Sequence, residues 1–149
     1  MERFCATSLA AVAWSLSGGL ILGSLWALWH LPGFLIPSEG LTDIPPRGTV
    51  LDFAVFALAL IGLRLIIQWV FNNTRGSVLM AILVHASWNT FYSAALVQLF
   101  PAPSVLGSYL NLTIASCALA VVIVALTRGH LGYEHYQQEE DPDLATASR

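Results

Sequence analysis

Four long apolar runs dominate this sequence and leave few folds open to it. Each is long enough to cross a bilayer as a helix, since roughly 20 apolar residues suffice. Only 10% of the chain is charged, whereas soluble domains carry about 25%. The sequence therefore predicts an all-α fold, a polytopic transmembrane helical bundle of about four spans. The runs cover approximately Leu9–Ile36, Val50–Phe71, Ser77–Phe100 and Val105–Thr127.

The breaks within and between the runs differ in character. Pro37–Gly48 contains two adjacent prolines and is predicted to be a loop. Asn72–Gly76 is a tight polar turn, so the second and third spans should form an antiparallel hairpin. Pro101–Pro103 separates the third span from the fourth. In the first run we expect a weak point at Ser15–Gly19 and a kink at Pro32.

Arginines predict the orientation, because the chain contains no lysine. In a four-span arrangement Arg3, Arg75 and Arg128 fall on one side of the membrane, and only Arg47 falls on the other. The positive-inside rule places the arginine-rich side in the cytoplasm. We therefore expect a multi-pass protein of the cell membrane with both termini cytoplasmic.

The chain divides into one membrane-embedded domain, residues 1–130, and an acidic cytoplasmic tail, residues 131–149, which we expect to be disordered. His130 and His135, near the start of that tail, are interpreted as surface histidines. The net charge of −3 argues against binding to nucleic acid. The expected partners are membrane lipid and a membrane-associated peptide substrate.

Two histidines inside apolar runs point to a functional site. His85 and Asn89 lie at positions i and i+4 of the third run, so they share one helix face. His30 lies in another apolar segment, WALWHLPGF. Polar side chains at membrane depth are costly and usually functional. We expect the helices that carry His30 and His85 to pack together and enclose a buried hydrolytic site.

Such a site requires both histidines to reach the same depth. His85 lies about 12 Å from Ser77 at 1.5 Å per residue. His30 lies about 15 Å into its span if that span begins near Leu20. A start at Leu9 would instead place His30 near the far surface. We therefore expect the first span to begin near Leu20.

Buried imidazoles offer several kinds of chemistry. They ligate metals, act as a general base on water and, beside a carboxamide, donate hydrogen bonds to an oxyanion. The alternatives without catalysis are an interfacial His30 among tryptophans and a His85 that serves helix packing. A haem held by both histidines is a further alternative, and the polar residues crowded around His85 argue against it.

Charged groups within the runs are few. Asp52, at the start of the second run, is the only acidic residue near a span interior, and Glu2 lies at the N-terminus. Arg64 lies deep in the second run, about 10 Å from Phe71. We expect the Arg64 side chain to extend toward the nearer interface. The alternative is contact with a carboxylate of the site or of a substrate.

The segments WALWHLP and NNTRGSVLMAILVHASWNTF carry two short motifs in order, Trp26-x-x-x-His30 and His85-x-x-x-Asn89. A polar Thr-x-Gly turn, residues 74–76, precedes the second of them. In this order, and on apolar runs, they resemble the CPBP family of intramembrane proteases, relatives of the CAAX prenyl endopeptidase and of bacteriocin-processing and immunity proteins. The family pattern is EExxxR, then FxxxH, then HxxxN.

The first family motif is missing. Arg3 matches the arginine of EExxxR by spacing, which would place the glutamate pair before Met1. The preferred explanation is a start site assigned too late. The alternatives are a catalytically silent member that retains a binding role, and, least favoured, Glu2 serving as the acid.

The resemblance implies hydrolysis of a peptide bond in a membrane-associated or lipidated peptide, as an intramembrane metalloendopeptidase would perform it. In a complete member the glutamates and His30 would activate water, while His85 and Asn89 would stabilise the oxyanion or join in metal binding. His30 and His85 are the expected ligands of a divalent metal such as zinc, although zinc usually takes three protein ligands. We expect the present chain to be inactive or very weak. The alternative function is a non-catalytic membrane binding or immunity protein that uses the same cavity.

Overall fold

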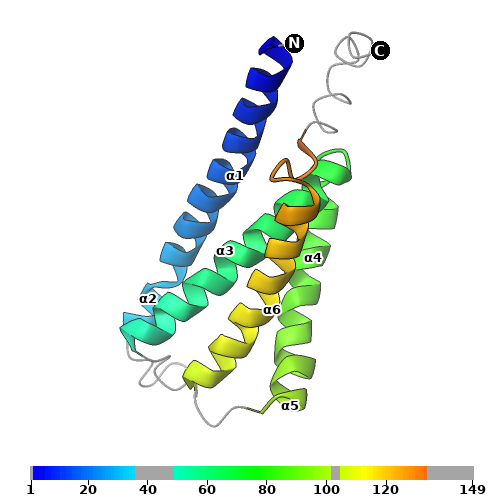
Figure 1. Cartoon of the computed structure of the whole chain (residues 1–149). Helices are drawn as coiled ribbons and strands as arrows, with labels where there is room; N and C mark the ends of the chain where they lie inside the picture. Colours follow the sequence, from blue (N-terminus) through cyan, green and yellow to red (C-terminus); the bar gives the residue numbers. More distant parts are fainter. Residues whose placement is uncertain (1, 36–48, 102–104, 134–149) are drawn as a thin grey trace.

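The computed structural model describes residues 2–35, 49–101 and 105–133, and within these ranges the chain is helical apart from short turns and contains no strand (Figure 1). The helical elements are α1 (Glu2–His30), α2 (Pro32–Leu35), α3 (Val50–Asn73), α4 (Val78–Phe91), the π-helix η1 (Tyr92–Leu96), α5 (Val97–Leu99) and α6 (Val105–Leu126).

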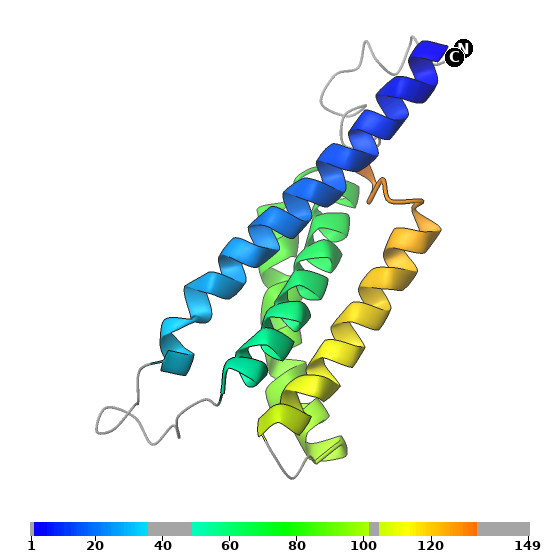
Figure 2. The same ribbon diagram turned by 60° about the vertical axis from the view of Figure 1, so that its left-hand side comes forward.

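α3 is the central element of the bundle and packs against α1, α4 and α6 (Figure 1, Figure 2). Three segments are long and apolar enough to cross a membrane, namely Ser15–Leu35, Val50–Asn73 and Leu106–Leu126. The remaining predicted span consists of α4, η1 and α5, which follow one another without a break. The prediction of an all-helical membrane bundle of about four spans is confirmed.

The outward-facing side chains of the helices are apolar, as lipid surroundings require. Large exposed hydrophobic residues occur on every long helix, for example Leu25, Trp29, Leu58, Leu79 and Val121. A soluble monomer rarely exposes so continuous an apolar surface. The backbone polar groups of these helices are satisfied internally, which is the condition for crossing a bilayer.

A buried stripe of small residues on α1 forms the contact with α3. A Cβ atom added at Gly19 would lie 2.7 Å from a methyl carbon of Leu65, and one at Gly23 would lie 3.2 Å from the Cα of the facing helix. Small residues let membrane helices approach this closely. The weak point predicted at Ser15–Gly19 is therefore wrong, because α1 continues through it and uses it for packing. The stripe comprises Ser15, Gly19, Gly23 and Ala27.

The helix extends well before Leu20, where the first span is expected to begin, and α1 already contacts α3 at Ser15. The side-chain amide of Gln68 donates a hydrogen bond to the Ser15 carbonyl oxygen over 2.9 Å. Within the part of the chain whose side chains are described, the segment long and apolar enough to cross a membrane is Ser15–Leu35. Serine and glycine interrupt the apolar pattern of the sequence, but between packed membrane helices they allow close contact.

A second close contact joins α3 to α6. A Cβ atom at Gly62 would lie 3.0 Å from the carbonyl carbon of Ser116 and 3.1 Å from the amide nitrogen of Cys117. The Thr113 hydroxyl donates to the carbonyl oxygen of Val55 over 2.8 Å. Close backbone approach and a polar bond between helices are the usual means of packing in lipid.

The predicted hairpin between the second and third spans is confirmed. The Gly76 N–H donates to the Phe71 carbonyl oxygen over 3.0 Å, and Arg75 and Gly76 adopt φ angles of 54° and 68°. This left-handed closure is the common ending of a helix. Ser77 then caps α4, because its side chain accepts a hydrogen bond from the Met80 N–H.

The residues after α6 fold back onto α1 and α3. Leu131 is fully buried, and its carbonyl oxygen accepts a 2.9 Å hydrogen bond from the side chain of Asn72. The Ser15 hydroxyl donates to the His130 carbonyl oxygen over 3.3 Å. The polar tail therefore begins beyond Leu131, and His130 is half-buried rather than an ordinary surface histidine.

The kink predicted at Pro32 is confirmed as a break in the helix. α1 ends at His30, and Pro32 opens α2, where a proline needs no backbone donor. The predicted loop Pro37–Gly48, which includes Arg47, lies outside the described residues. The tail from residue 134, which includes His135, also lies outside them. The start of α1, the α3–α4 turn and the segment after α6 lie at one end of the bundle (Figure 1, Figure 2).

Candidate functional site

The helices that carry His30 and His85 meet around one indole. The rings of Trp26 and His85 lie with centroids 5.0 Å apart and planes at 82°. The rings of Trp26 and His30 lie 6.1 Å apart at 62°. The structure thus brings both histidines against Trp26. The expected enclosed and buried site is not found, because no residue of α4 is buried and both histidines are only half-buried. The catalytic and metal-binding roles of these residues stay predictions.

The register of α1 on α3 explains how the histidines come together although α1 begins well before Leu20. α1 runs antiparallel to α3, with Gly23 against Ile61 and His30 against Phe56. His30 therefore lies near the beginning of α3, away from the hairpin turn. Trp26 lies one turn of helix closer to the hairpin than His30, and its ring bridges the difference in depth between His30 and His85.

His30 is held in one tautomer by its own helix. Its Nδ1 lies 2.9 Å from the carbonyl oxygen of Trp26. A carbonyl oxygen only accepts, so Nδ1 carries the proton and donates it to this bond. In the neutral ring Nε2 then bears the lone pair, and that nitrogen is the one available to a proton or a metal.

Aromatic rings close the site along α3. The His30 imidazole lies 5.4 Å from the Phe56 ring at 67°. Phe56 packs in turn on Phe34 of α2 at 5.4 Å and on Tyr109 of α6 at 5.3 Å. These edge and tilted contacts connect α2 to the bundle and limit movement of the His30 ring. This cluster was not predicted from the sequence, although aromatic residues three positions apart in the second run could have indicated it.

The polar residues beyond His85 are arranged differently from the expectation. Asn89 lies one turn further along α4 and is exposed. The Thr90 hydroxyl donates to the Ala86 carbonyl oxygen over 3.0 Å, so it binds its own helix. The next residues form the π-helix η1, a rare element that is frequent at functional sites. The apolar sequence contains no signal for it.

The acidic candidate Asp52 is engaged elsewhere. Its Oδ2 accepts hydrogen bonds from the backbone N–H of Thr49 and, over 2.8 Å, from the Thr49 hydroxyl. These bonds form a capping box at the start of α3. Asp52 is the only acidic residue whose side chain the structure describes. Within that part of the chain, the histidines are therefore not joined by a carboxylate.

His30 and His85 fit a zinc ion poorly. No group of three or more histidine, cysteine, aspartate or glutamate side chains is close enough to hold a metal in the described part of the chain. Zinc usually takes three protein ligands, whereas His30 and His85 supply two. The described donor set does not match zinc, and we assign no chemical step to a metal.

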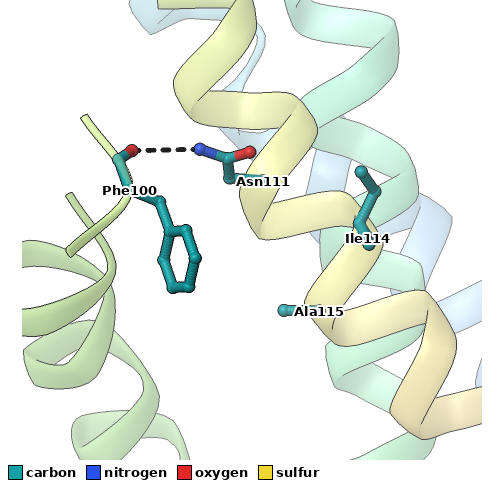
Figure 3. Close-up of a pocket in the computed structure, with 4 residues that line it drawn as sticks. All are labelled: Phe100, Asn111, Ile114 and Ala115. Atoms are coloured by element: carbon teal, nitrogen blue, oxygen red, sulfur yellow. Dashed lines mark hydrogen bonds between the residues drawn. The ribbon is translucent and has the colours of Figure 1, made fainter. Parts of the chain in front are cut away.

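Two cavities lined by described residues lie away from the histidines. One, of about 230 Å³, lies between the end of α5 and α6, where the Asn111 amide donates to the Phe100 carbonyl oxygen over 3.1 Å (Figure 3). The other, of about 340 Å³, lies between α3 and α6 and is lined by apolar residues and Cys117. Neither is lined by His30 or His85, so the candidate site remains the contact around Trp26.

Comparison with known proteins gives one match. The family model of the Rce1-like proteins, type II CAAX prenyl endopeptidases, matches residues 3–91, more than half of the chain. No curated protein and no solved structure matches the chain. The matched segment contains Trp26, His30, His85 and Asn89, and it ends two residues after the last of them. The chain belongs to the Rce1-like family of type II CAAX prenyl endopeptidases.

Proposed function

We propose that this chain is an intramembrane endopeptidase that hydrolyses a peptide bond of a prenylated or otherwise membrane-associated peptide. The observation that carries the proposal is the position of Trp26, whose indole contacts the imidazoles of His30 and His85 from two different helices. Membership of the family supports the reaction class.

The tautomer of His30 suggests how water is activated. With Nδ1–H bonded to the Trp26 carbonyl, Nε2 accepts a proton from water as the water oxygen attacks the scissile carbonyl carbon. The same nitrogen then returns that proton to the leaving amine. His85 and Asn89, one turn apart on α4, donate hydrogen bonds to the oxyanion that forms.

The lack of a carboxylate beside His30 among the described side chains predicts slow hydrolysis. Asp52 is held in its capping box by Thr49, so His30 has no described acidic neighbour to orient it or to share the proton. We propose that the 149-residue chain cleaves very slowly or not at all. A chain extended upstream by a glutamate pair is expected to cleave faster.

The membrane setting is part of the proposal. Arg3, Arg75 and Arg128 belong to the segments gathered at one end of the bundle. An excess of arginine marks the cytoplasmic side, so we place both termini and the hairpin turn in the cytoplasm of a cell-membrane protein. Its partners are lipid and a peptide substrate that enters from that side.

Cleavage of an S-farnesylated peptide in lipid nanodiscs, followed by mass spectrometry, tests the enzymatic proposal. In a chain extended by a glutamate pair, His85→Ala and Asn89→Ala should each lower the rate about 100-fold or more, because each removes a donor to the oxyanion. Ser87→Ala, on the exposed opposite side of α4, is the matched control and should leave the rate unchanged. If even a chain extended by a glutamate pair cleaves nothing, the enzymatic proposal loses its main support.

The lack of a described carboxylate favours a second candidate, a non-catalytic membrane protein that binds a peptide at the same place. Such a protein needs the shape of the site more than its proton chemistry. His85→Ala would then leave the cellular phenotype intact, whereas an enzyme would lose its activity with that substitution. The comparison of the phenotype with in vitro cleavage separates the two candidates.

A further inference from the structure

The cavity between α3 and α6 is an apolar groove that the histidine site does not use. Its volume is about 340 Å³, and all of its lining residues are apolar apart from Cys117. The Cys117 thiol donates to the carbonyl oxygen of Leu58 over 3.5 Å, so the thiol already has a partner. Val121, on the wall formed by α6, is 66% exposed. This α3–α6 groove therefore opens sideways, toward the lipid that surrounds the bundle.

The α3–α6 groove ends at Arg128. Along α6 its wall extends from Cys117 to Ala125, which is about 12 Å at 1.5 Å per residue. The Arg128 N–H donates to the carbonyl oxygen of Ala125 over 3.2 Å. The Gly129 N–H donates to the carbonyl oxygen of Val124, which also lines the groove, over 2.8 Å. Backbone hydrogen bonds thus fix Arg128 at the end of the groove, on the side of the bundle where the hairpin turn lies (Figure 1, Figure 2).

Arg128 occupies a backbone position that favours glycine. Its φ angle is 51°, in the left-handed region where a Cβ atom is unfavourable. The residue is exposed and lies just beyond the apolar segment Leu106–Leu126. Among the residues that the structure describes, the Arg128 guanidinium has neither a hydrogen bond nor an ion pair. A cation at a position suited to glycine indicates a role besides closing the helix.

The end of α3 provides an internal comparison. The sequence Thr-Arg-Gly occurs at residues 74–76 and again at residues 127–129. In both places the arginine is exposed with a positive φ angle, 54° for Arg75, and the threonine hydroxyl donates to a carbonyl oxygen one turn earlier over 2.8 Å. The closure of α3 is bonded to Phe71, which does not line the α3–α6 groove. Arg75 therefore matches Arg128 in charge and backbone but not in its position at the groove.

We propose that the α3–α6 groove and Arg128 together bind one anionic phospholipid, with an acyl chain in the groove and the phosphate on the guanidinium. An acyl chain is as well accommodated by bulk lipid as by apolar side chains, so the charge of Arg128 supplies the selectivity. A guanidinium forms parallel hydrogen bonds with phosphate oxygens. Basic residues at the ends of spaces between membrane helices are suited to anionic headgroups. This lipid site is separate from the histidines and does not depend on the proposed peptidase activity.

Two other occupants of the groove would behave differently. A second copy of the chain would pack one of its helices there, and a lipid would then be excluded. A lipid held by its acyl chain alone would bind with an affinity that does not depend on the charge of its headgroup or on Arg128.

The test measures lipid binding to the whole chain in a non-ionic detergent by native mass spectrometry. The probes are phosphatidylglycerol and phosphatidylcholine with identical acyl chains, each titrated against the protein. We expect the first phosphatidylglycerol to bind about five- to tenfold more tightly than the first phosphatidylcholine, because one arginine contacts the anionic headgroup. Equal affinity for the two lipids, or a dimer that carries no lipid, would overturn the proposal.

Arg128→Gly separates the charge of the side chain from the closure of the helix. Glycine suits the left-handed position better than arginine. The midpoint of thermal unfolding should therefore stay the same or rise, while the preference for phosphatidylglycerol disappears. Arg128→Lys should retain part of the preference, since it keeps the charge.

Arg75→Gly is the matched control, because it removes the same charge from the same backbone conformation at the end of α3. It should retain the preference for phosphatidylglycerol. An equal loss in Arg75→Gly and Arg128→Gly would mean that general attraction to positive charge selects the lipid. That result, or a preference that persists in Arg128→Gly, contradicts a site at the groove.

A second pair of variants tests the groove itself. Val121→Phe fills the groove from the α6 wall, so tight binding of the first phosphatidylglycerol should be lost. Val122→Phe adds the same ring at an exposed position of α6 that does not line the groove, and it should bind as wild type does. If Val121→Phe also binds as tightly as wild type, the acyl chain does not occupy the groove and the proposal fails.

Discussion

The indole of Trp26 meets the imidazole of His85 edge to face, with ring centroids 5.0 Å apart. One ring belongs to α1 and the other to α4, and the same indole also contacts His30 on its own helix. Trp26 is therefore the physical connection between the two histidine motifs. It stands where the family pattern FxxxH has its aromatic residue.

Removing this indole should separate the two histidines. Trp26→Ala loses an aromatic contact worth about 1 kcal/mol beyond its buried area, and we expect peptide binding or cleavage to fall about tenfold or more. Trp26→Phe keeps an aromatic ring at the same position and should retain most of the function. Equal loss in both variants would show that the contact needs the indole specifically, and no loss in either would remove Trp26 from the site.

Asp52 should matter for stability and not for chemistry. Asp52→Asn weakens the capping box with Thr49, and we expect the midpoint of thermal unfolding to fall. Peptide binding and cleavage per folded molecule should be unchanged. Thr49→Ala disturbs the same cap and serves as the matched variant. A loss of cleavage in Asp52→Asn alone would instead make Asp52 the missing acid.

The close approach of α3 to α6 should not tolerate even one methyl group. In Gly62→Ala the new Cβ would lie 3.0 to 3.2 Å from backbone atoms of α6, so the helices must move apart. We expect a loss of about 1–3 kcal/mol, measured by thermal unfolding in detergent. Gly18→Ala is the control on α1, because nothing lies within 4 Å of its added Cβ. That variant should be neutral or more stable, since alanine favours helix.

The packing of the segment after α6 should depend on the side-chain amide of Asn72. Asn72→Ala leaves the carbonyl oxygen of the buried Leu131 without its hydrogen bond, at a cost of about 1–2 kcal/mol. Proteolysis within residues 127–133 should then become faster. Ser87→Ala, at an exposed position on α4, is the control. Similar proteolysis of both variants would contradict this role of Asn72.

The sequence was sufficient for those features that depend on local pattern. Apolar run length predicted the spans, the polar NNTRG segment predicted the hairpin, and Pro32 predicted the end of α1. The spacing of His85 and the position of His30 predicted that their helices meet. Each of these follows from the chemistry of one short segment, with little influence from the rest of the chain.

Features that depend on packing partners were missed. Ser15–Gly19 looked like an interruption, because only the facing α3 shows that small residues there provide contact. The burial of Leu131 depends on Asn72, almost 60 residues away, and the π-helix after Phe91 has no local signal. The sequence left Asp52 as a candidate acid, because only the structure shows that its carboxylate accepts hydrogen bonds from Thr49.

Cross-linking measures the meeting of α1 and α4 most directly. In a background with Cys5 and Cys117 replaced by serine, Trp26→Cys with His85→Cys should be joined by a bifunctional thiol reagent with a short spacer. The control pair, Trp29→Cys with His85→Cys, should not be joined, because Trp29 is 82% exposed on the outer face of α1. Efficient linkage of the first pair alone is the predicted result. Failure of that pair to link, or equal linkage of the control pair, would contradict a shared site around Trp26.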